Sequence, residues 1–249
     1  MPQALSIVTG SSRGLGRAVV QQLLARGHRV LALARAATDL PVPPGAELTA
    51  WQVDLAEPQP VADRLAAWLQ AQDASQISAV NLINNAGVVS TPAPLSRSSA
   101  QELQNAMRVG LEAPVLLSAA FLQATAGWPC PRKLMLVSSG LGRRAMAGSA
   151  SYCAAKAGLD HLARALALEE AQVPNGARVV SLAPGVIDTD MQVQLRGADA
   201  ALFPEVARFQ GLKDGGHLDS PDEAAAKLLR ALDRADYGEQ PVSDVRELA

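Results

Sequence analysis

The chain has 249 residues, of which 49% are hydrophobic, 18% charged and 3% aromatic, with a formal net charge of −2. This balance argues against nucleic acid or an acidic membrane surface as a partner. No apolar run reaches the roughly 18 residues of a membrane span, and the start of the chain lacks the pattern of a signal peptide. We therefore expect a cytoplasmic protein.

Short apolar runs alternate with longer helical patterns along most of the chain. The runs predicted as strands are 4–9, 29–34, 48–53, 79–84, 133–138 and 177–182. The stretches predicted as helices are 15–26, about 58–72, 99–126 and 150–172. Gly27 and Gly176 follow two of them, where a left-handed residue is favoured. A last helix is predicted after Ser220, a suitable N-cap that Pro221 follows.

The predicted strands are almost continuously apolar, as expected when helices cover both faces of a sheet. Strand–helix repetition with right-handed crossovers predicts a Rossmann-type, doubly wound parallel sheet in three α/β/α layers. We expect a single domain over 1–249, with a substrate loop at about 190–220. Residues 191–216 have no clear period; Met191, Leu195, Phe203 and Phe209 favour a mobile apolar lid or, equally, an oligomer contact.

The stretch "TGSSRGLG" places Gly10, Gly14 and Gly16 between the first strand and the first helix. Such a turn lets backbone amides approach a phosphate, which the helix N-terminus also attracts. The spacing differs from the commonest dinucleotide motif and from that of nucleoside triphosphatases. Alone it is also compatible with a tight turn that binds nothing.

The residue near the end of the second strand usually contacts the adenosine ribose of a dinucleotide. Here that residue is Arg35, and Arg13 lies in the glycine loop itself. Two guanidinium groups suit a 2′-phosphate, so we expect NADP(H) to be preferred over NAD(H). The alternatives are a solvated loop arginine at position 35 and, more weakly, ribose binding by Asp39.

Tyr152 and Lys156 lie four residues apart on a predicted helix, so their side chains share one face. Ser138 and Ser139 end the fifth strand, at the edge of the sheet where ligands bind. A carbonyl that accepts hydride also needs a proton. A tyrosine with a pKa of about 10 supplies it more readily beside an ammonium group, which lowers that pKa.

These motifs together resemble the short-chain dehydrogenase/reductase family over nearly the whole chain. The similar segments are "TGSSRGLG", "VDL" (53–55), "NNAG" (84–87), "YCAAK" (152–156) and "APGVIDTDM" (183–191). The resemblance implies that Tyr152 is the general acid and that Lys156 lowers its pKa and holds the nicotinamide ribose. The family's serine stands thirteen positions before the tyrosine, which selects Ser139 over Ser138.

The resemblance also implies a set of cofactor contacts. Asp54 would meet the adenine ring, Asn85 and Gly87 would line the cleft, and Ile187 with Thr189 would anchor the carboxamide. The full expected cofactor-binding set is Gly10, Ser12, Arg13, Gly14, Leu15, Gly16, Arg35, Asp54, Leu55, Asn85, Ala86, Gly87, Tyr152, Lys156, Pro184, Gly185, Ile187 and Thr189.

Two positions depart from the family pattern. Gly110 stands where the family usually has an asparagine of the proton relay; a backbone group and an extra water in the vacated space could replace it. The C-terminal "YGEQPVSDVREL" lacks the usual Val-Asp-Gly-Gly strand and resembles the sepiapterin reductase and benzil reductase branch. That branch implies dicarbonyl or aromatic ketone substrates and a homodimer, with a homotetramer as the family's other form.

We therefore expect an NADPH-dependent carbonyl reductase, reversible as an alcohol dehydrogenase, that acts on a ketone, diketone or aldehyde. The alternative is a non-catalytic NADP-binding regulator, which only Gly110 favours; a sugar-nucleotide epimerase is disfavoured by the short chain. His28, His161 and His217 have no neighbouring ligands, so no metal site is expected. Cys130 and Cys153 are expected to pack as small apolar side chains.

Overall fold

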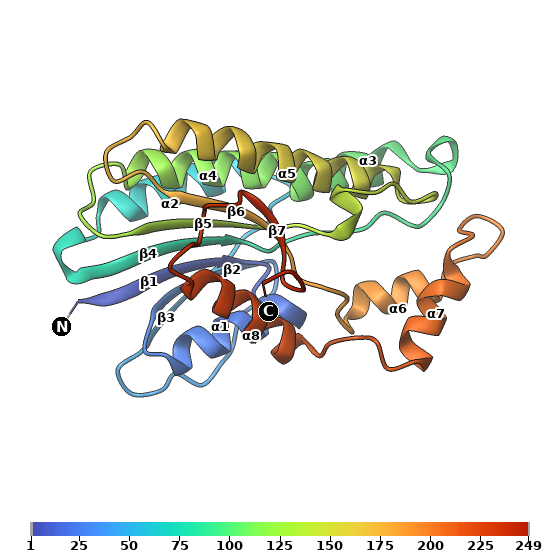
Figure 1. Ribbon diagram of the computed structural model, residues 1–249, viewed down its shortest axis with the longest axis horizontal. Coiled ribbons are helices and arrows are strands. Elements are labelled where there is room, and N and C mark those ends of the chain that lie inside the picture. The colour runs from blue at the N-terminus through green and yellow to red at the C-terminus, as the bar shows by residue number, and fades with distance from the viewer. Residues whose placement is uncertain (1, 249) are drawn as a thin grey trace.

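The computed structural model describes residues 2–248 and contains a parallel sheet of seven strands in the order β3-β2-β1-β4-β5-β6-β7 (Figure 1). The strands are β1 (Gln3–Thr9), β2 (Arg29–Ala34), β3 (Glu47–Gln52), β4 (Ile77–Asn84), β5 (Arg132–Val137), β6 (Arg178–Ala183) and β7 (Val242–Asp244). The strand order reverses between β1 and β4, the place where ligands bind in open sheets of this kind.

Helices cover both faces of this sheet. They are α1 (Gly14–Ala25), α2 (Pro58–Gln70), α3 (Ala100–Met107), α4 (Ala113–Ala124), α5 (Ala150–Glu170), α6 (Asp190–Arg196), α7 (Val206–Asp214) and α8 (Pro221–Asp233). Figure 1 shows α2, α4 and α5 above the sheet and α1 and α8 below it, each group packed on its own apolar core. The predicted three-layer Rossmann-type fold is confirmed.

The predicted strands are confirmed with boundaries that differ by two residues or fewer. The short edge strand β7 was not predicted. Gly27 has the expected left-handed backbone, with φ of +76°. The prediction for Gly176 was wrong, because the left-handed residue there is Asn175. Glycine is required at position 176 because the backbone packs closely there: a Cβ would lie 1.9 Å from the carbonyl oxygen of Glu170.

The helix predicted over 99–126 is interrupted. A π-helical turn spans Arg108–Glu112 between α3 and α4, and it contains Gly110. An inserted π turn carries one extra residue in the helix and leaves backbone groups without their usual partners, which is why such turns occur at functional sites. The interruption lies where the sequence departs from the family pattern.

The segment without a clear period, 191–216, contains helices α6 and α7. Its apolar side chains form a small core of their own, in which Phe203 is fully buried and stacks on Phe209 with a centroid distance of 5.7 Å. Met146, from the loop before α5, belongs to the same core. In Figure 1 these two helices stand beyond the carboxyl ends of the strands.

The N-terminus of α8 is confirmed as a capped helix start. The Ser220 hydroxyl accepts the backbone N–H of Glu223, and the Glu223 carboxylate accepts the backbone N–H of Ser220. This capping box satisfies two backbone donors that a bare helix end leaves open.

Replacing Ser220 with alanine is therefore expected to lower the free energy of unfolding by about 1 kcal/mol. Urea unfolding followed by circular dichroism measures the effect. The control is Ser96→Ala, which changes an exposed serine of the short 3₁₀ turn Leu95–Arg97. Equal midpoints for both variants would contradict a stabilising cap at Ser220.

None of the helices between residues 2 and 248 combines the length and apolar composition that a membrane crossing requires. Both cysteines are free, and each packs in an apolar cluster: Cys130 between the sheet and the upper helices, and Cys153 beside the core of α6 and α7.

Candidate active site

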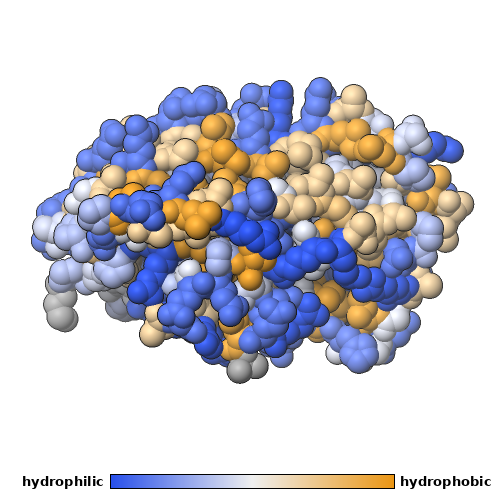
Figure 2. All heavy atoms as spheres, turned by 45° about the horizontal axis from the view of Figure 1, so that its top comes forward, coloured by the Kyte–Doolittle hydropathy of each residue, from blue (hydrophilic) through white to orange (hydrophobic). Residues whose placement is uncertain are grey.

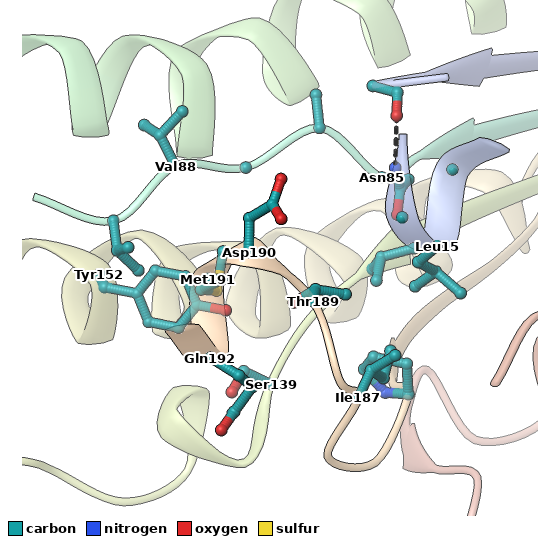
Figure 3. A pocket seen from close by; sticks show the side chains of 18 of the residues that line it. Leu15, Asn85, Val88, Ser139, Tyr152, Ile187, Thr189, Asp190, Met191 and Gln192 are labelled. Carbon is teal, nitrogen blue, oxygen red and sulfur yellow. Dashed lines mark hydrogen bonds between the residues drawn. The ribbon is translucent and has the colours of Figure 1, made fainter. Parts of the chain in front are cut away.

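A cavity of about 1060 Å³ lies at the carboxyl ends of the strands, around the point where the strand order reverses. Figure 3 shows Tyr152 and Ser139 at one end of it, and Leu15 and Asn85 at the other. All of the site residues predicted from the sequence line this one cavity: Gly10, Ser12, Arg13, Gly14, Leu15, Gly16, Arg35, Asp54, Leu55, Asn85, Ala86, Gly87, Ser139, Tyr152, Lys156, Pro184, Gly185, Ile187 and Thr189.

The glycine loop is held by the Asn85 side chain. Its amide donates to the carbonyl oxygen of Thr9 at 2.9 Å, and a Cβ on Gly16 would lie 2.5 Å from the same amide nitrogen. A Cβ on Gly10 would approach the backbone of Ala86 to 2.9 Å. At Gly10 and Gly16 the close neighbour is thus the chain itself. Gly10 and Gly14 also have positive φ angles, +70° and +51°.

The N-terminus of α1 opens into the cavity without a cap. Arg13, its N-cap residue, makes no side-chain cap hydrogen bond, and the first turn contains no acidic residue. Free backbone N–H groups and the helix dipole make such an end suitable for an anion. The residues present therefore fit the pyrophosphate of a dinucleotide at the glycine loop.

The two arginines predicted near the adenosine ribose differ in their surroundings. Arg13 forms an ion pair with Asp190 of α6 at 2.7 Å, and both side chains are exposed. Exposed pairs contribute little, about 0–1 kcal/mol, so a phosphate can compete for this guanidinium. Arg35 is exposed at the cavity wall, while Asp39 lies outside the residues that line it.

The two serines at the end of β5 have different partners. Ser138 is buried, and its hydroxyl donates to the carboxylate of Asp160 at 2.7 Å. Ser139 faces the cavity and begins the short turn Gly140–Gly142, where its hydroxyl accepts the N–H of Leu141 at 3.2 Å. Of the two, Ser139 is the one placed beside Tyr152, as Figure 3 shows.

Burial dominates the electrostatics of the Tyr152–Lys156 pair. The Lys156 nitrogen lies 5.5 Å from the centre of the Tyr152 ring and donates to the carbonyl oxygen of Val137 at 2.7 Å. Burial lowers the pKa of Lys156 to about 8, although the negative charge of Asp160 opposes this. Burial raises the pKa of Tyr152 to about 12, and the Ser139 side chain acts in the opposite direction.

The expected decrease in the Tyr152 pKa is therefore not present in the protein alone. A tyrosine with a raised pKa holds its proton firmly, and it releases this proton only when a positive charge stabilises the anion. The Lys156 ammonium is a cationic group close to the Tyr152 ring.

Gly110 is packed closely against helix α5 on one side. Helix α5 packs so closely that a Cβ on Gly110 would lie 3.1 Å from the Cβ of Ala155, the neighbour of Lys156. On this side, helix α5 lies close to the place where the side chain of the family's asparagine would stand at position 110.

Replacing Gly110 with asparagine is expected to lower the free energy of unfolding by about 1–3 kcal/mol, because the added side chain must displace Ala155. Urea unfolding measures this. The control is Gly211→Asn in α7, where a Cβ meets nothing within 4 Å. Equal destabilisation of both variants would contradict crowding at Ala155, and an unchanged rate and pH profile would argue against a catalytic role for position 110.

Sequence reasoning missed part of the cavity wall. Asp244 and Arg246, at and beyond the end of β7, line it, as do Arg144 and Gln192. Thr9 was missed as well: its hydroxyl accepts the N–H groups of both Asn85 and Ala86 at 2.9 Å. The C-terminal segment departs from the family pattern, and this departure was the signal that could have pointed to the β7 residues of the cavity wall.

Comparison with known proteins agrees with this geometry. The family model of short chain dehydrogenases matches residues 5–200. The chain is 35% identical over 230 residues to a benzil reductase ((S)-benzoin forming) of Bacillus subtilis (strain 168), covering 92% of this chain and 93% of that protein. It is 32% identical over 246 residues to the sepiapterin reductase of Rattus norvegicus, covering 93% and 92%.

Among solved structures, KRED1-Pglu superposes with a TM-score of 0.81 and 27% identity, covering 96% of this chain and 100% of that one. A putative 2-deoxy-d-gluconate 3-dehydrogenase from Agrobacterium tumefaciens with bound NADP has a TM-score of 0.78 and 27% identity, covering 98% and 95%. The resemblance to the sepiapterin and benzil reductase branch is confirmed. The chain belongs to the short-chain dehydrogenase/reductase family and is an NAD(P)-dependent oxidoreductase that acts on carbonyl and alcohol groups.

Proposed function

We propose that the protein is an NADPH-dependent carbonyl reductase, which works in reverse as an alcohol dehydrogenase. The observation that carries the proposal is the convergence of Ser139, Tyr152 and Lys156 on the cavity into which the uncapped N-terminus of α1 opens. One end of the cavity suits an anionic dinucleotide, and the other holds a proton donor beside a buried ammonium.

The nicotinamide, when bound, supplies the hydride. Tyr152 donates the proton to the carbonyl oxygen, and the Ser139 hydroxyl donates a hydrogen bond to the same oxygen. Lys156 stabilises the tyrosine anion that results and holds the nicotinamide ribose. Its low exposure, 4%, strengthens this charge interaction because water screens it little.

The residues expected from the sequence would hold the cofactor. The loop from Gly10 to Gly16 would hold the pyrophosphate, Asp54 and Leu55 would meet the adenine, and Pro184 to Thr189 would hold the carboxamide side. Arg35, with Arg13 after exchange from Asp190, binds a 2′-phosphate, which is the basis for preferring NADP(H). The NADP bound in the Agrobacterium tumefaciens structure supports this preference.

The substrate lies between Tyr152 and the segment 190–220 of a single domain. Apolar side chains of Val88, Met146, Leu195 and Phe209 line that end of the cavity. They suit a diketone or aromatic ketone, as the names of the benzil and sepiapterin reductases would imply. Residues 191–216 act as a lid over this substrate or as an oligomer contact.

We propose a homodimer or homotetramer because apolar side chains are exposed on helices α4 and α5. Val115 of α4 and Leu168 of α5 are exposed apolar side chains, the latter with 74% of its surface accessible. Figure 2, in which the side of the molecule that carries α4 and α5 is turned forward, shows apolar patches between polar side chains. Sedimentation velocity of the wild type and of Leu168→Glu tests whether this face joins subunits.

The test of the function is a panel of carbonyl compounds with NADPH consumption as the readout. Benzil, other diketones, aromatic ketones and aldehydes are offered in turn, each with NADPH and with NADH. Reduction of at least one class with NADPH preferred is expected. No consumption across the panel, with NADPH bound tightly, would favour the alternative of a non-catalytic NADP-binding regulator, for which Gly110 is the supporting residue.

A further inference from the structure

Three consecutive residues at the end of β5 each hold a different residue of helix α5. The carbonyl oxygen of Val137 accepts the Lys156 ammonium at 2.7 Å, and the next residue, Ser138, donates to Asp160 at 2.7 Å. Ser139, which follows, lies beside Tyr152. The register between this strand and this helix therefore decides where all three proposed catalytic side chains lie.

Asp160 is the charged member of this arrangement that the proposed mechanism does not use. It is 2% exposed and stands one helical turn after Lys156. One carboxylate oxygen accepts hydroxyl groups from Ser138 and from Ser181 of β6, both at 2.7 Å. The helix thereby binds two neighbouring strands through a single atom.

The second carboxylate oxygen of Asp160 accepts no hydrogen bond. The Arg143 Nε lies 3.3 Å away, which makes an ion pair without hydrogen-bond alignment. Arg143 in turn donates to the carbonyl oxygen of Ser243 at 2.7 Å and lies 3.9 Å from the carboxylate of Asp244 in the cavity wall. A buried carboxylate costs free energy unless it is paired, so this one is expected to have a role.

We propose that Asp160 is a positioning residue of the active site, whose carboxylate sets the register of β5 against α5 and keeps Lys156 in its ammonium form. This inference rests on the proposed roles of Tyr152 and Lys156. The buried ammonium loses most of its hydration, and a fixed negative charge one turn away replaces part of the stabilisation that water gave.

The other groups around Lys156 leave Asp160 as its main source of negative charge. The π-helical turn presents buried Val109 and Gly110 and keeps Arg108 and Glu112 exposed. Cys153, on the helix itself, lies beside Tyr152. From β7, Asp244 is held by Arg246 at 2.6 Å and by Arg143.

The sign of the effect follows from these charges. Burial lowers the pKa of Lys156 to about 8, and Asp160 raises it. Asparagine at position 160 keeps the shape and the acceptor for both serines but removes the charge, so the pKa of Lys156 falls. Glutamine at position 143 removes the cation that faces Asp160, so the pKa of Lys156 rises.

The test is the pH titration of Lys156 in the intact protein, without cofactor. The chain has four lysines, Lys133, Lys156, Lys213 and Lys227. Reductive methylation with ¹³C-formaldehyde gives each a resolved NMR signal, and Lys156→Arg assigns the one at the cavity. Asp160→Asn is expected to move its titration to lower pH by on the order of one unit, and Arg143→Gln to higher pH by less.

Ser181→Ala is the matched control, because it removes a hydrogen bond to the same carboxylate oxygen and no charge. Its Lys156 titration should match that of the wild type. A second readout is the alkaline limb of kcat/KM, which moves in the same direction as the titration in each variant. A titration unmoved in Asp160→Asn, or moved the same way by Asp160→Asn and Arg143→Gln, would overturn the proposal.

Two further results separate this inference from the proposed function. If Asp160→Asn does not fold, Arg143→Gln still tests the charge coupling, and an unmoved titration there contradicts it. If no carbonyl compound is reduced, the NMR titration still decides the role of Asp160 toward Lys156, whereas the failure belongs to the proposed reductase activity.

Discussion

Replacing Tyr152 with phenylalanine is expected to lower kcat by about 10²- to 10⁴-fold, the range for losing a general acid. The ring and its packing remain, so the binding of NADPH, measured by fluorescence, should stay close to that of the wild type. The loss concerns one proton: burial raises the pKa of Tyr152 to about 12, so at neutral pH its hydroxyl carries the proton that the proposed mechanism transfers.

The chain provides a matched control, because it contains two tyrosines. Tyr237 is buried on the other side of the sheet, where its hydroxyl donates to the carbonyl oxygen of Leu134 at 2.9 Å. Tyr237→Phe removes a similar hydroxyl and should lower stability by about 1 kcal/mol while leaving kcat unchanged. Near-full activity in Tyr152→Phe would refute the proposed mechanism.

Replacing Arg35 with aspartate is expected to reverse the cofactor preference, lowering kcat/KM with NADPH tenfold or more while retaining activity with NADH. Each hydrogen bond between charged groups contributes about 1.5–3 kcal/mol, so a lost guanidinium–phosphate contact is sufficient for that change. The introduced carboxylate repels a 2′-phosphate and can accept a ribose hydroxyl instead. Initial rates with each cofactor, at saturating carbonyl substrate, give the ratio.

Arg97→Asp is the control for the change in net charge. Arg97 is exposed and lies outside the cavity lining, so the ratio of the two cofactors should remain that of the wild type. If the wild-type protein already uses NADH better than NADPH, the assignment of Arg35 to a 2′-phosphate is wrong.

The fold was predictable because its signals are local. Most of the six longer strands are largely apolar runs, β3 being the most polar of them, and the helices between them have a clear period or a recognisable cap, as at Ser220. The strand β7 has three residues, "VSD", without an apolar run, so pairing with β6 rather than composition makes it a strand. Helices α6 and α7 depend on the core around Phe203, which includes Met146 from a distant part of the chain.

The residues of the site could be predicted only where they belong to a sequence motif. Tyr152, Lys156 and the glycine loop have fixed spacings that a sequence displays. Asp160 is one turn beyond Lys156 and could be mistaken for a surface residue, because its burial depends on how α5 meets β5 and β6. The close approach of Ala155 to Gly110 in the π-helical turn likewise follows from helix packing, which no spacing in the sequence records.

The cavity wall runs from Gly10, near the first residues, to Arg246, close to the last. Contacts between such distant parts of a chain form slowly, because closing long loops costs entropy before packing repays it. During synthesis the loop, the first four strands and the Tyr152–Lys156 helix all leave the ribosome before β7 exists. The cavity wall is therefore complete only once β7 has paired with β6, and until then the proposed catalytic residues lie beside an unfinished wall.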